Sequence, residues 1–411
     1  MINYNKFTLK NGLKVIVHKD ETTPLVAFNL IYNVGARDEN PEKTGFAHLF
    51  EHLMFEGSKN IPNYDSPLQT VSGTNNAFTN NDFTNYYITL PKENIETAFW
   101  LESDRMLELA FSEKKLEIQK NVVIEEYKER YLNQPYGNDT LLLRDLAYKV
   151  HPYRWSTIGK TTKHIEDVTL QDVKDFFHKH YAPNNAILSI AGNVEVDDIK
   201  KLAEKWFAPI EPRNVAPKNI PKEPKQIEQR RLTVKEDVPF NAIYIAFPYF
   251  ERLHPKYHAT DLLSDVLANG DSSRFYQKLV KENNIFTEID AYITGSIDKG
   301  IFIIDGKPAE GVSMETAEKE IWKELENIKN ELINDYELQK VKNSIESTME
   351  FSKTSILDKA ITLGYYELLE NVELINTEQE KYNNVTLEIM KETANDIFQK
   401  TNSSVLYYLS N

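Results

Sequence analysis

The sequence has 411 residues, more than one ordinary domain, and this length predicts two. A net charge of −15 argues against a nucleic-acid-binding protein, and the absence of cysteine excludes disulfides and thiolate metal sites. The sequence contains no run of about 18 apolar residues, the length that would predict a membrane span. The N-terminal run MINYNKFTLKNGLKVIVHKD also lacks the apolar segment of a signal peptide. We therefore expect a cytoplasmic protein, or a periplasmic one if an export signal has been removed.

The chain begins with predicted strands, followed by a helix that carries two histidines. Residues 6–34 indicate strands, because FTLKNGLKVIVHKD has an Asn11-Gly12 turn between alternating segments and LVAFNLIYNVG is a longer apolar run. The next run, TGFAHLFEHLMFEGS, predicts a helix that is apolar on nearly every side. A buried helix of this kind rarely holds two histidines and a glutamate without partners.

His48, Glu51 and His52 form an H-x-x-E-H pattern, the inverted form of the H-E-x-x-H metalloprotease signature. Side chains at i and i+4 of a helix lie about 6 Å apart on one face, which suits two imidazoles that bind one metal ion. Zinc is the expected metal, because imidazole and carboxylate ligands with one open position are typical of catalytic zinc. Glu51 is expected to lie beside the ion and to act as the general base. Two ordinary core or surface histidines are the alternative, which the apolar flanks disfavour.

The turn-rich run GTNNAFTNNDFTNYYITLP predicts a pair of strands after the histidine helix. If Asn76-Ala77-Phe78 forms an edge strand beside that helix, its free N–H and C=O groups can pair with an extended peptide of any sequence. The alternative is an ordinary edge strand blunted by polar residues. Phe55, one turn beyond His52, is a candidate for lining a pocket for a bulky side chain, although most apolar helix residues belong to the core.

A third metal ligand is expected from the helix predicted in LEIQKNVVIEEYKER. Glu125 and Glu126 are adjacent and point about 100° apart, so only one of them can face the ion. Glu126 shares a face with Gln119, Val122 and Val123, whereas Glu125 lies nearer the polar side. We assign Glu126 as the ligand, and an exposed helix charge is the alternative for either residue.

Later segments predict a second copy of the same sheet-and-helix unit. LVAFNLIYNVG is echoed by NAIYIAFPYF, and FHKHYAPNNAILSIAG by IFQKTNSSVLYYLSN. The Pro-, Lys- and Glu-rich run between the copies predicts an extended linker. The expected fold is α+β, with two homologous domains. The predicted division is a zinc-binding domain at 1–208, a linker at 209–230 and a domain without a metal site at 231–411.

Alignment of the two copies shows why the second one is expected to lack the metal. Gly57 and Gly270 end the two corresponding helices. Counting back from these glycines aligns Asp261 with His48, Ser264 with Glu51 and Asp265 with His52.

Together these runs resemble the pitrilysin/insulysin-like zinc peptidases (M16), in the branch of the mitochondrial processing peptidases and their bacterial relatives. The resemblance spans nearly the whole chain and is carried by LKNGLKVIVHKD, VGARDENPEKTGFAHLFEHLMFEGS, GTNNAFTNNDFTNYYITLP, NVVIEEYKERYLNQPYG, HPYRWSTIGK and NGDSSRFYQKL. It implies one zinc ion per chain, Glu51 as the base and substrate strand addition along Asn76-Ala77-Phe78. The third ligand of the family, about 75 residues after the second histidine, falls on Glu126. The resemblance also implies that the chain is one half of a clam-shaped peptidase and forms a dimer.

One segment departs from the family pattern. The non-zinc half of family members contributes an Arg and a Tyr, seven residues apart, that grip the substrate, and the matching positions here hold Val280 and Thr287. Neither side chain donates hydrogen bonds as a guanidinium and a phenol do. Arg274 and Tyr276 precede the motif and are expected to serve the structure of their own domain. Our hypothesis is a catalytic, zinc-bearing subunit of a heterodimer whose partner supplies the Arg/Tyr pair, with a homodimer as the alternative.

The leading functional hypothesis is a zinc endopeptidase that acts on peptides or unfolded segments. A non-catalytic core or scaffold subunit of a larger assembly is the alternative, which the presence of His48, Glu51, His52 and Glu126 disfavours. A third hypothesis is a peptide-binding partner that holds zinc but hydrolyses peptides only when assembled. The expected binding partners are therefore a peptide and a second subunit, rather than nucleic acid or a membrane.

Overall fold

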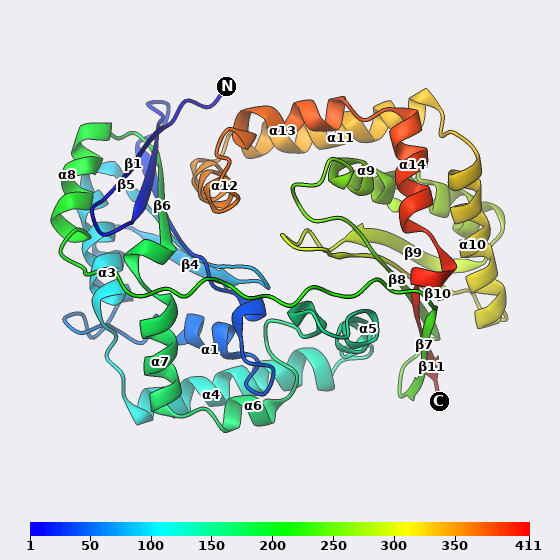
Figure 1. Cartoon of the computed structure of the whole chain (residues 1–411), viewed down its shortest axis with the longest axis horizontal. Helices are drawn as coiled ribbons and strands as arrows, with labels where there is room; N and C mark the ends of the chain where they lie inside the picture. The colour runs from blue at the N-terminus through cyan, green and yellow to red at the C-terminus, as the bar shows by residue number, and fades with distance from the viewer. The chain divides into compact units, whose positions relative to one another are not determined.

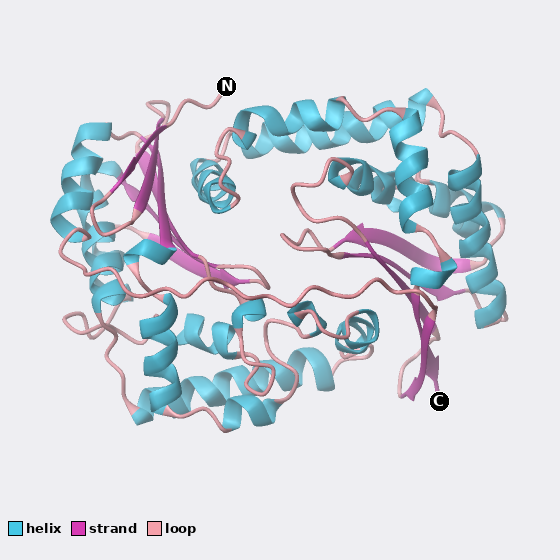
Figure 2. Ribbon diagram, viewed as in Figure 1, coloured by secondary structure: helices cyan, strands magenta, loops and turns pink.

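The computed structural model describes residues 1–411, which divide into two compact units. Each unit is a mixed β-sheet with helices packed on it (Figures 1 and 2), and the predicted α+β class is confirmed. The units are discontinuous in sequence. The first contains Met1–Tyr127, Ser156–Ile220 and Met349–Glu378, and the second contains Lys128–Trp155, Pro221–Thr348 and Gln379–Asn411.

The first unit is built on a six-stranded sheet in the order β1-β2-β6-β3-β5-β4. Strands β2 and β6 are parallel, and the other neighbours are antiparallel. Strand β4 therefore lies at one edge, paired only with β5. The strand bounds are β1 Asn5–Thr8, β2 Lys14–Lys19, β3 Leu25–Tyr32, β4 Thr74–Thr79, β5 Thr84–Pro91 and β6 Ala186–Gly192.

The helices of the first unit pack on both faces of this sheet. On one face the ring of Phe28 from β3 lies 5.1 Å from that of Phe99 and 6.4 Å from that of Phe207, which forms an aromatic core. The helix bounds are α1 Phe46–Leu53, α2 Asp65–Thr70, α3 Ile95–Leu107, α4 Glu113–Tyr127, α6 Thr162–Glu166, α7 Leu170–His180, α8 Val196–Trp206 and α12 Ile356–Leu368.

The second unit repeats this topology in a five-stranded sheet, in the order β7-β11-β8-β10-β9. Strands β7 and β11 are parallel and the other pairs are antiparallel, so that β9 is the counterpart of β4. The two copies predicted from the sequence echoes are thus confirmed. The bounds are β7 Arg230–Glu236, β8 Ala242–Pro248, β9 Phe286–Ile293, β10 Ile301–Pro308, β11 Ser404–Ser410, α5 Asp139–Ala147, α9 Tyr257–Ala268, α10 Met314–Asn330 and α14 Leu387–Ile397. Helices α11 Asp335–Ser352 and α13 Leu374–Asn383 each cross a boundary between the units.

Helix α12 comes from the second half of the sequence but packs on the first sheet. Its Ala360 contacts Ala27 and Ala191, and the Ser189 hydroxyl donates to the Ala360 carbonyl at 2.7 Å. Small residues on both sides bring the helix backbone close to the strands. Glu367, nearly fully buried, completes the docking by pairing with lysines of β1 and the following strand.

Helix α5 shows the reverse of the α12 arrangement: it comes from the first half of the sequence and packs on the second sheet. Its Leu143 lies in one cluster with Tyr244 and Leu406 of that sheet. The division expected from the sequence consists of consecutive segments, 1–208 and 231–411, whereas the compact units exchange residues 128–155 and 349–378. The physical reason is that an amphipathic pattern shows which helix face is apolar but not which of two similar sheets it covers.

The run predicted to be a linker contains no helix or strand between 211 and 228. It is nevertheless held to its neighbours: the Lys218 ammonium pairs with Asp38 at 2.8 Å, and the Glu223 carboxylate accepts the backbone N–H groups of residues 149–151. No helix in the chain combines the length and the apolar character needed to cross a lipid bilayer.

Candidate metal centre

Helix α1 fixes two histidines by burying the side chains between them. Leu49 and Phe50 have no exposed surface, and the Phe50 ring lies 4.4 Å from the ring of Tyr181. His48 and His52 project together from the other side of the helix, with ring centroids 4.8 Å apart. The i, i+4 spacing of the sequence therefore places both imidazoles on one face, as predicted.

The N-terminus of α1 is held by a carboxylate from an earlier segment. Glu39, 8% exposed, accepts the backbone N–H of Gly45 at 3.0 Å and that of Ala47 at 2.8 Å. A negative charge at a helix N-terminus is favourable because it satisfies free N–H groups and complements the helix dipole. Gly45 precedes the helix at a φ of 85°, in the left-handed region that favours glycine. Together these contacts fix the start of α1 and so the direction in which its histidines project.

Helix α4 supplies the third side chain. Glu126 is 19% exposed and faces the histidines, whereas Glu125 is exposed. The sequence-based choice between the two glutamates therefore agrees with their orientation. Of the two valines that share this face in the sequence, Val123 is buried whereas Val122 is 44% exposed.

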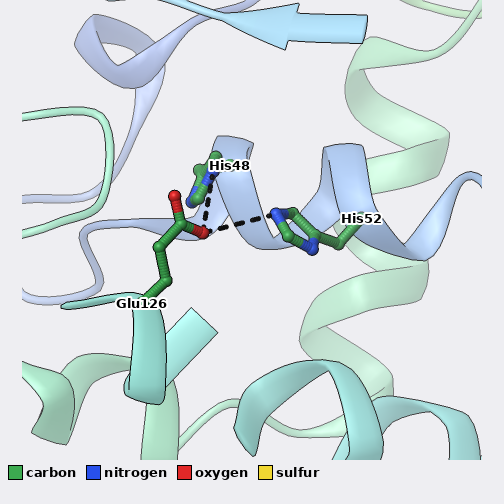
Figure 3. Close-up of side chains that lie close together, drawn as sticks. All are labelled: His48, His52 and Glu126. Atoms are coloured by element: carbon green, nitrogen blue, oxygen red, sulfur yellow. Dashed lines mark ion pairs between the residues drawn. The ribbon is translucent and has the colours of Figure 1, made fainter. Parts of the chain in front are cut away.

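The three side chains converge on one point (Figure 3). The Nε2 atoms of His48 and His52 each lie 3.7 Å from Oε2 of Glu126, and the ligand atoms of all three residues lie within 4.8 Å of one another. Ligands around a tetrahedral zinc ion, with bonds of about 2.0–2.1 Å, lie about 3.4 Å apart. Two nitrogens and one carboxylate oxygen at these separations fit a zinc ion with small adjustments of the side chains.

Glu51 is the fourth polar residue of the site. Its Oε2 accepts a hydrogen bond from the hydroxyl of Thr79, at the end of β4, at 2.5 Å. Burial raises the pKa of the Glu51 carboxyl, the Thr79 hydrogen bond opposes that change, and the negative charge of Glu126 adds to it. A half-buried carboxylate whose pKa is shifted toward neutrality is suited to accept and release a proton.

Gln119 of α4 lies behind His52 and orients its ring. The Nδ1 atom of His52 is 3.3 Å from Oε1 of Gln119, and the Gln119 amide donates to Oε1 of Glu56 at 2.6 Å. Because the amide oxygen is an acceptor, His52 donates through Nδ1 and keeps the Nε2 lone pair for a metal ion. Gln119 shares the Glu126 face in the sequence, but neither Gln119 nor Thr79 belongs to a local pattern that predicts a role in the site.

The segment Asn76-Ala77-Phe78 lies in the edge strand β4, next to α1, as expected. Its residues pair with Tyr87, Tyr86 and Asn85 of β5, and no strand of this chain pairs with the opposite edge. The side-chain oxygen of Asn76 accepts the N–H of Ala77 at 2.8 Å. The strand thus offers a backbone edge beside the three candidate metal ligands, and its use by a substrate stays a prediction.

Phe55 lies just beyond the end of α1 and is only partly buried. Its ring packs against Tyr64 and Tyr86, with centroids 5.5 and 6.1 Å away, and the Arg105 guanidinium lies over all three rings. The Phe55 ring is thus part of a cation–π cluster around Arg105. A role in lining a substrate pocket is not tested by these contacts and stays a prediction.

The corresponding helix of the second unit, α9, carries no such cluster. Asp261 accepts the hydroxyl of Tyr382 at 2.6 Å, and Asp265 accepts the amide of Asn269 at 3.0 Å. Burial raises the pKa of Asp265 to about 6. His48, His52 and Glu126 are the one group of three side chains in the structure that could hold a metal ion.

The segment expected to carry a substrate-binding Arg/Tyr pair lies in the second unit. Val280 falls within a π-helical turn, Tyr276–Glu282, and Thr287 within β9. Nearby, Arg274 makes a two-point ion pair with Glu337, at 2.7 and 2.9 Å. Its guanidinium is therefore engaged within its own unit, which agrees with the structural role expected for it.

Comparisons with known proteins point to one family. Residues 14–158 match the family model "Insulinase (Peptidase family M16)", and residues 167–345 match "Peptidase M16 inactive domain". The chain is 29% identical to the zinc protease PqqE of Helicobacter pylori over 98% of this chain and 92% of that protein. It superposes on the crystal structure of a protease from Helicobacter pylori with a TM-score of 0.92 and 28% identity, over 99% of this chain and 100% of the other.

A more distant structure shares the fold alone. The periplasmic protease PqqL of Escherichia coli is 16% identical, with a TM-score of 0.79, and the match covers 100% of this chain but 48% of that one. The chain therefore has the fold of one half of the PqqL chain.

Proposed function

Because the chain belongs to the M16 family of peptidases, we propose that it is a zinc-dependent endopeptidase that hydrolyses peptides or unfolded segments. The observation that carries this proposal is the convergence of His48, His52 and Glu126 on one point, with Glu51 beside them. One zinc ion per chain fits these three side chains. A scaffold subunit without activity is a weaker alternative, because the three candidate zinc ligands and the candidate base are all present.

Hydrolysis requires zinc ligands and a group that transfers protons, and different residues of the chain are assigned to these two roles. His48, His52 and Glu126 would hold the zinc ion, which when bound polarises the scissile carbonyl and lowers the pKa of water at the open position. Glu51 accepts the proton that water loses as it attacks the carbonyl carbon, and then donates this proton to the departing amine. The tetrahedral carbon then re-forms a carbonyl as the C–N bond breaks.

Substrate binding is assigned to the edge of β4. Asn76, Ala77 and Phe78 offer backbone groups to an extended peptide, and the Asn76 side chain, which now occupies the N–H of Ala77, would move aside. Such pairing is independent of side chains, so it suits unfolded segments of varied sequence. Phe55 is proposed to contact a bulky substrate side chain with the partly exposed side of its ring.

The catalytic unit is proposed to be a two-subunit enzyme. The match to 48% of the PqqL chain supports an arrangement in which a second chain supplies the other half. Val280 and Thr287 lack the donors expected of a substrate clamp, so we infer that the partner is an M16-like subunit with an Arg/Tyr pair. A homodimer is the alternative, and the expected cytoplasmic location stays a prediction.

The test is cleavage of a quenched fluorescent peptide by the purified chain, alone and co-purified with a candidate partner. We expect chelator-sensitive cleavage that is strong only with the partner, and a Glu51→Gln variant that keeps its zinc but loses turnover by a factor on the order of a hundred or more. A chain that binds no zinc, or an active Glu51→Gln variant, would refute the peptidase. Strong activity of the chain alone would refute only the heterodimer.

A further inference from the structure

Thr79 connects the edge strand to the general base. It is the last residue of β4, directly after Asn76-Ala77-Phe78, and its hydroxyl donates to Oε2 of Glu51 at 2.5 Å. This is the hydrogen bond that the structure gives to the Glu51 side chain, and it joins two elements, strand β4 and helix α1. The oxygen Oε1 of the same carboxylate is left without a hydrogen bond from the protein.

No neighbouring acceptor competes with Glu51 for the hydroxyl proton of Thr79. A hydroxyl has one proton to donate. The other acceptor within reach is the Thr84 hydroxyl at 3.4 Å, too long to compete with a carboxylate at 2.5 Å. Thr84 sends its own proton to the Val34 carbonyl at 2.9 Å. The Thr79 hydroxyl is therefore committed to one oxygen of the carboxylate, which fixes the rotation of the Glu51 side chain.

We propose that Thr79 is a positioning residue, which holds the Glu51 carboxylate in the orientation for proton transfer and links it to the substrate-binding edge of β4. This inference rests on the proposed peptidase function. A peptide that pairs along Asn76-Ala77-Phe78 would order the strand up to the residue that holds the base. Binding of the substrate backbone and alignment of the base would then depend on the same short strand.

The test compares Thr79→Val, which keeps the shape and removes the hydroxyl, with Thr79→Ser, which keeps the hydroxyl. Thr74→Val, at the exposed start of the same strand, is the matched control. Losing one hydrogen bond to a charged group is expected to lower kcat about tenfold to a hundredfold in Thr79→Val, with KM and zinc content unchanged. Thr79→Ser and Thr74→Val are expected to stay within about threefold of the parent kcat.

A crystal structure of each variant gives a readout that does not depend on activity. We expect the Glu51 carboxylate to keep its position in Thr79→Ser and to rotate away in Thr79→Val. An unmoved carboxylate in Thr79→Val, a parental kcat, or equal losses in the Val and Ser variants would overturn the role of Thr79. Failure of the peptidase proposal would look different, because then Glu51→Gln would cleave peptides as well as the parent, or the parent would not cleave them at all.

Discussion

The amide of Gln119 is expected to set how tightly the chain holds zinc, although it does not contact the ion. The change to test is Gln119→Ala. In the structure Oε1 of Gln119 lies 3.3 Å from Nδ1 of His52, and the amide nitrogen is anchored on Glu56 at 2.6 Å. Partners of this kind fix the ring orientation and the tautomer of a metal-binding histidine, and their removal costs about 10–100-fold in metal affinity.

The geometry places the expected effect at the lower end of that range. A neutral acceptor at 3.3 Å makes a long hydrogen bond. We therefore expect Gln119→Ala to raise the Kd for zinc about tenfold, a loss of about 1.4 kcal/mol in binding free energy. A Gln119→Glu variant is the matched control. Its carboxylate would accept more strongly from His52 but would lie against the carboxylate of Glu56, so the two effects oppose each other and the change should be smaller than for alanine.

Competition titration of zinc against a chromogenic chelator at neutral pH measures these affinities directly. Circular dichroism of each variant checks that the fold is retained. A Gln119→Ala variant that is folded and binds zinc as tightly as the parent would show that His52 is oriented by the helix alone, and the reasoning from its Nδ1 partner would be refuted.

Two further substitutions test the second unit and the segment exchange. Burial raises the pKa of Asp265 from 3.8 to about 6, so between these values the folded chain keeps a proton that the unfolded chain releases, and the free energy of unfolding falls as the pH rises. Between these pH values the carboxyl of Asp265 should lower the free energy of unfolding by about 2 kcal/mol, and Asp265→Asn should abolish this contribution. Urea unfolding across this pH range measures it, and parallel pH curves for parent and variant would contradict it. In α12, a Cβ at Gly364 would lie 2.8 Å from the Ser189 hydroxyl oxygen and 2.9 Å from Cδ1 of Ile31, so Gly364→Val should lower the free energy of unfolding by about 1–3 kcal/mol. An unchanged urea midpoint would mean that α12 does not pack closely on the first sheet.

The parts of the site that depend on local spacing could be predicted from the sequence. His48 and His52 share a face because the helix period puts them there, and Glu126 follows from the choice between two adjacent glutamates. Strand β4 could be placed at an edge because its polar, turn-rich pattern is typical of edge strands. Each of these inferences uses residues close together in the sequence.

The remaining features depend on tertiary contacts that no local pattern contains. Thr79 and Gln119 are single polar residues, and their roles arise only where a strand meets α1 and where α4 passes behind His52. The exchange of α5 and α12 between the sheets is equally hidden, because both helices have faces that either sheet could cover. Val122 shows the limit of periodicity, since an apolar residue on a helix can still point to solvent.

Zinc content after exhaustive dialysis is the most direct test of the three-residue metal site. The parent and a variant with Glu125→Ala, a change at an exposed residue outside the group of three, are expected to retain one zinc ion per chain by elemental analysis. Glu126→Ala, one position along the same helix, is expected to lose it. A parent chain without zinc, or a folded Glu126→Ala variant with full zinc occupancy, would contradict the assignment.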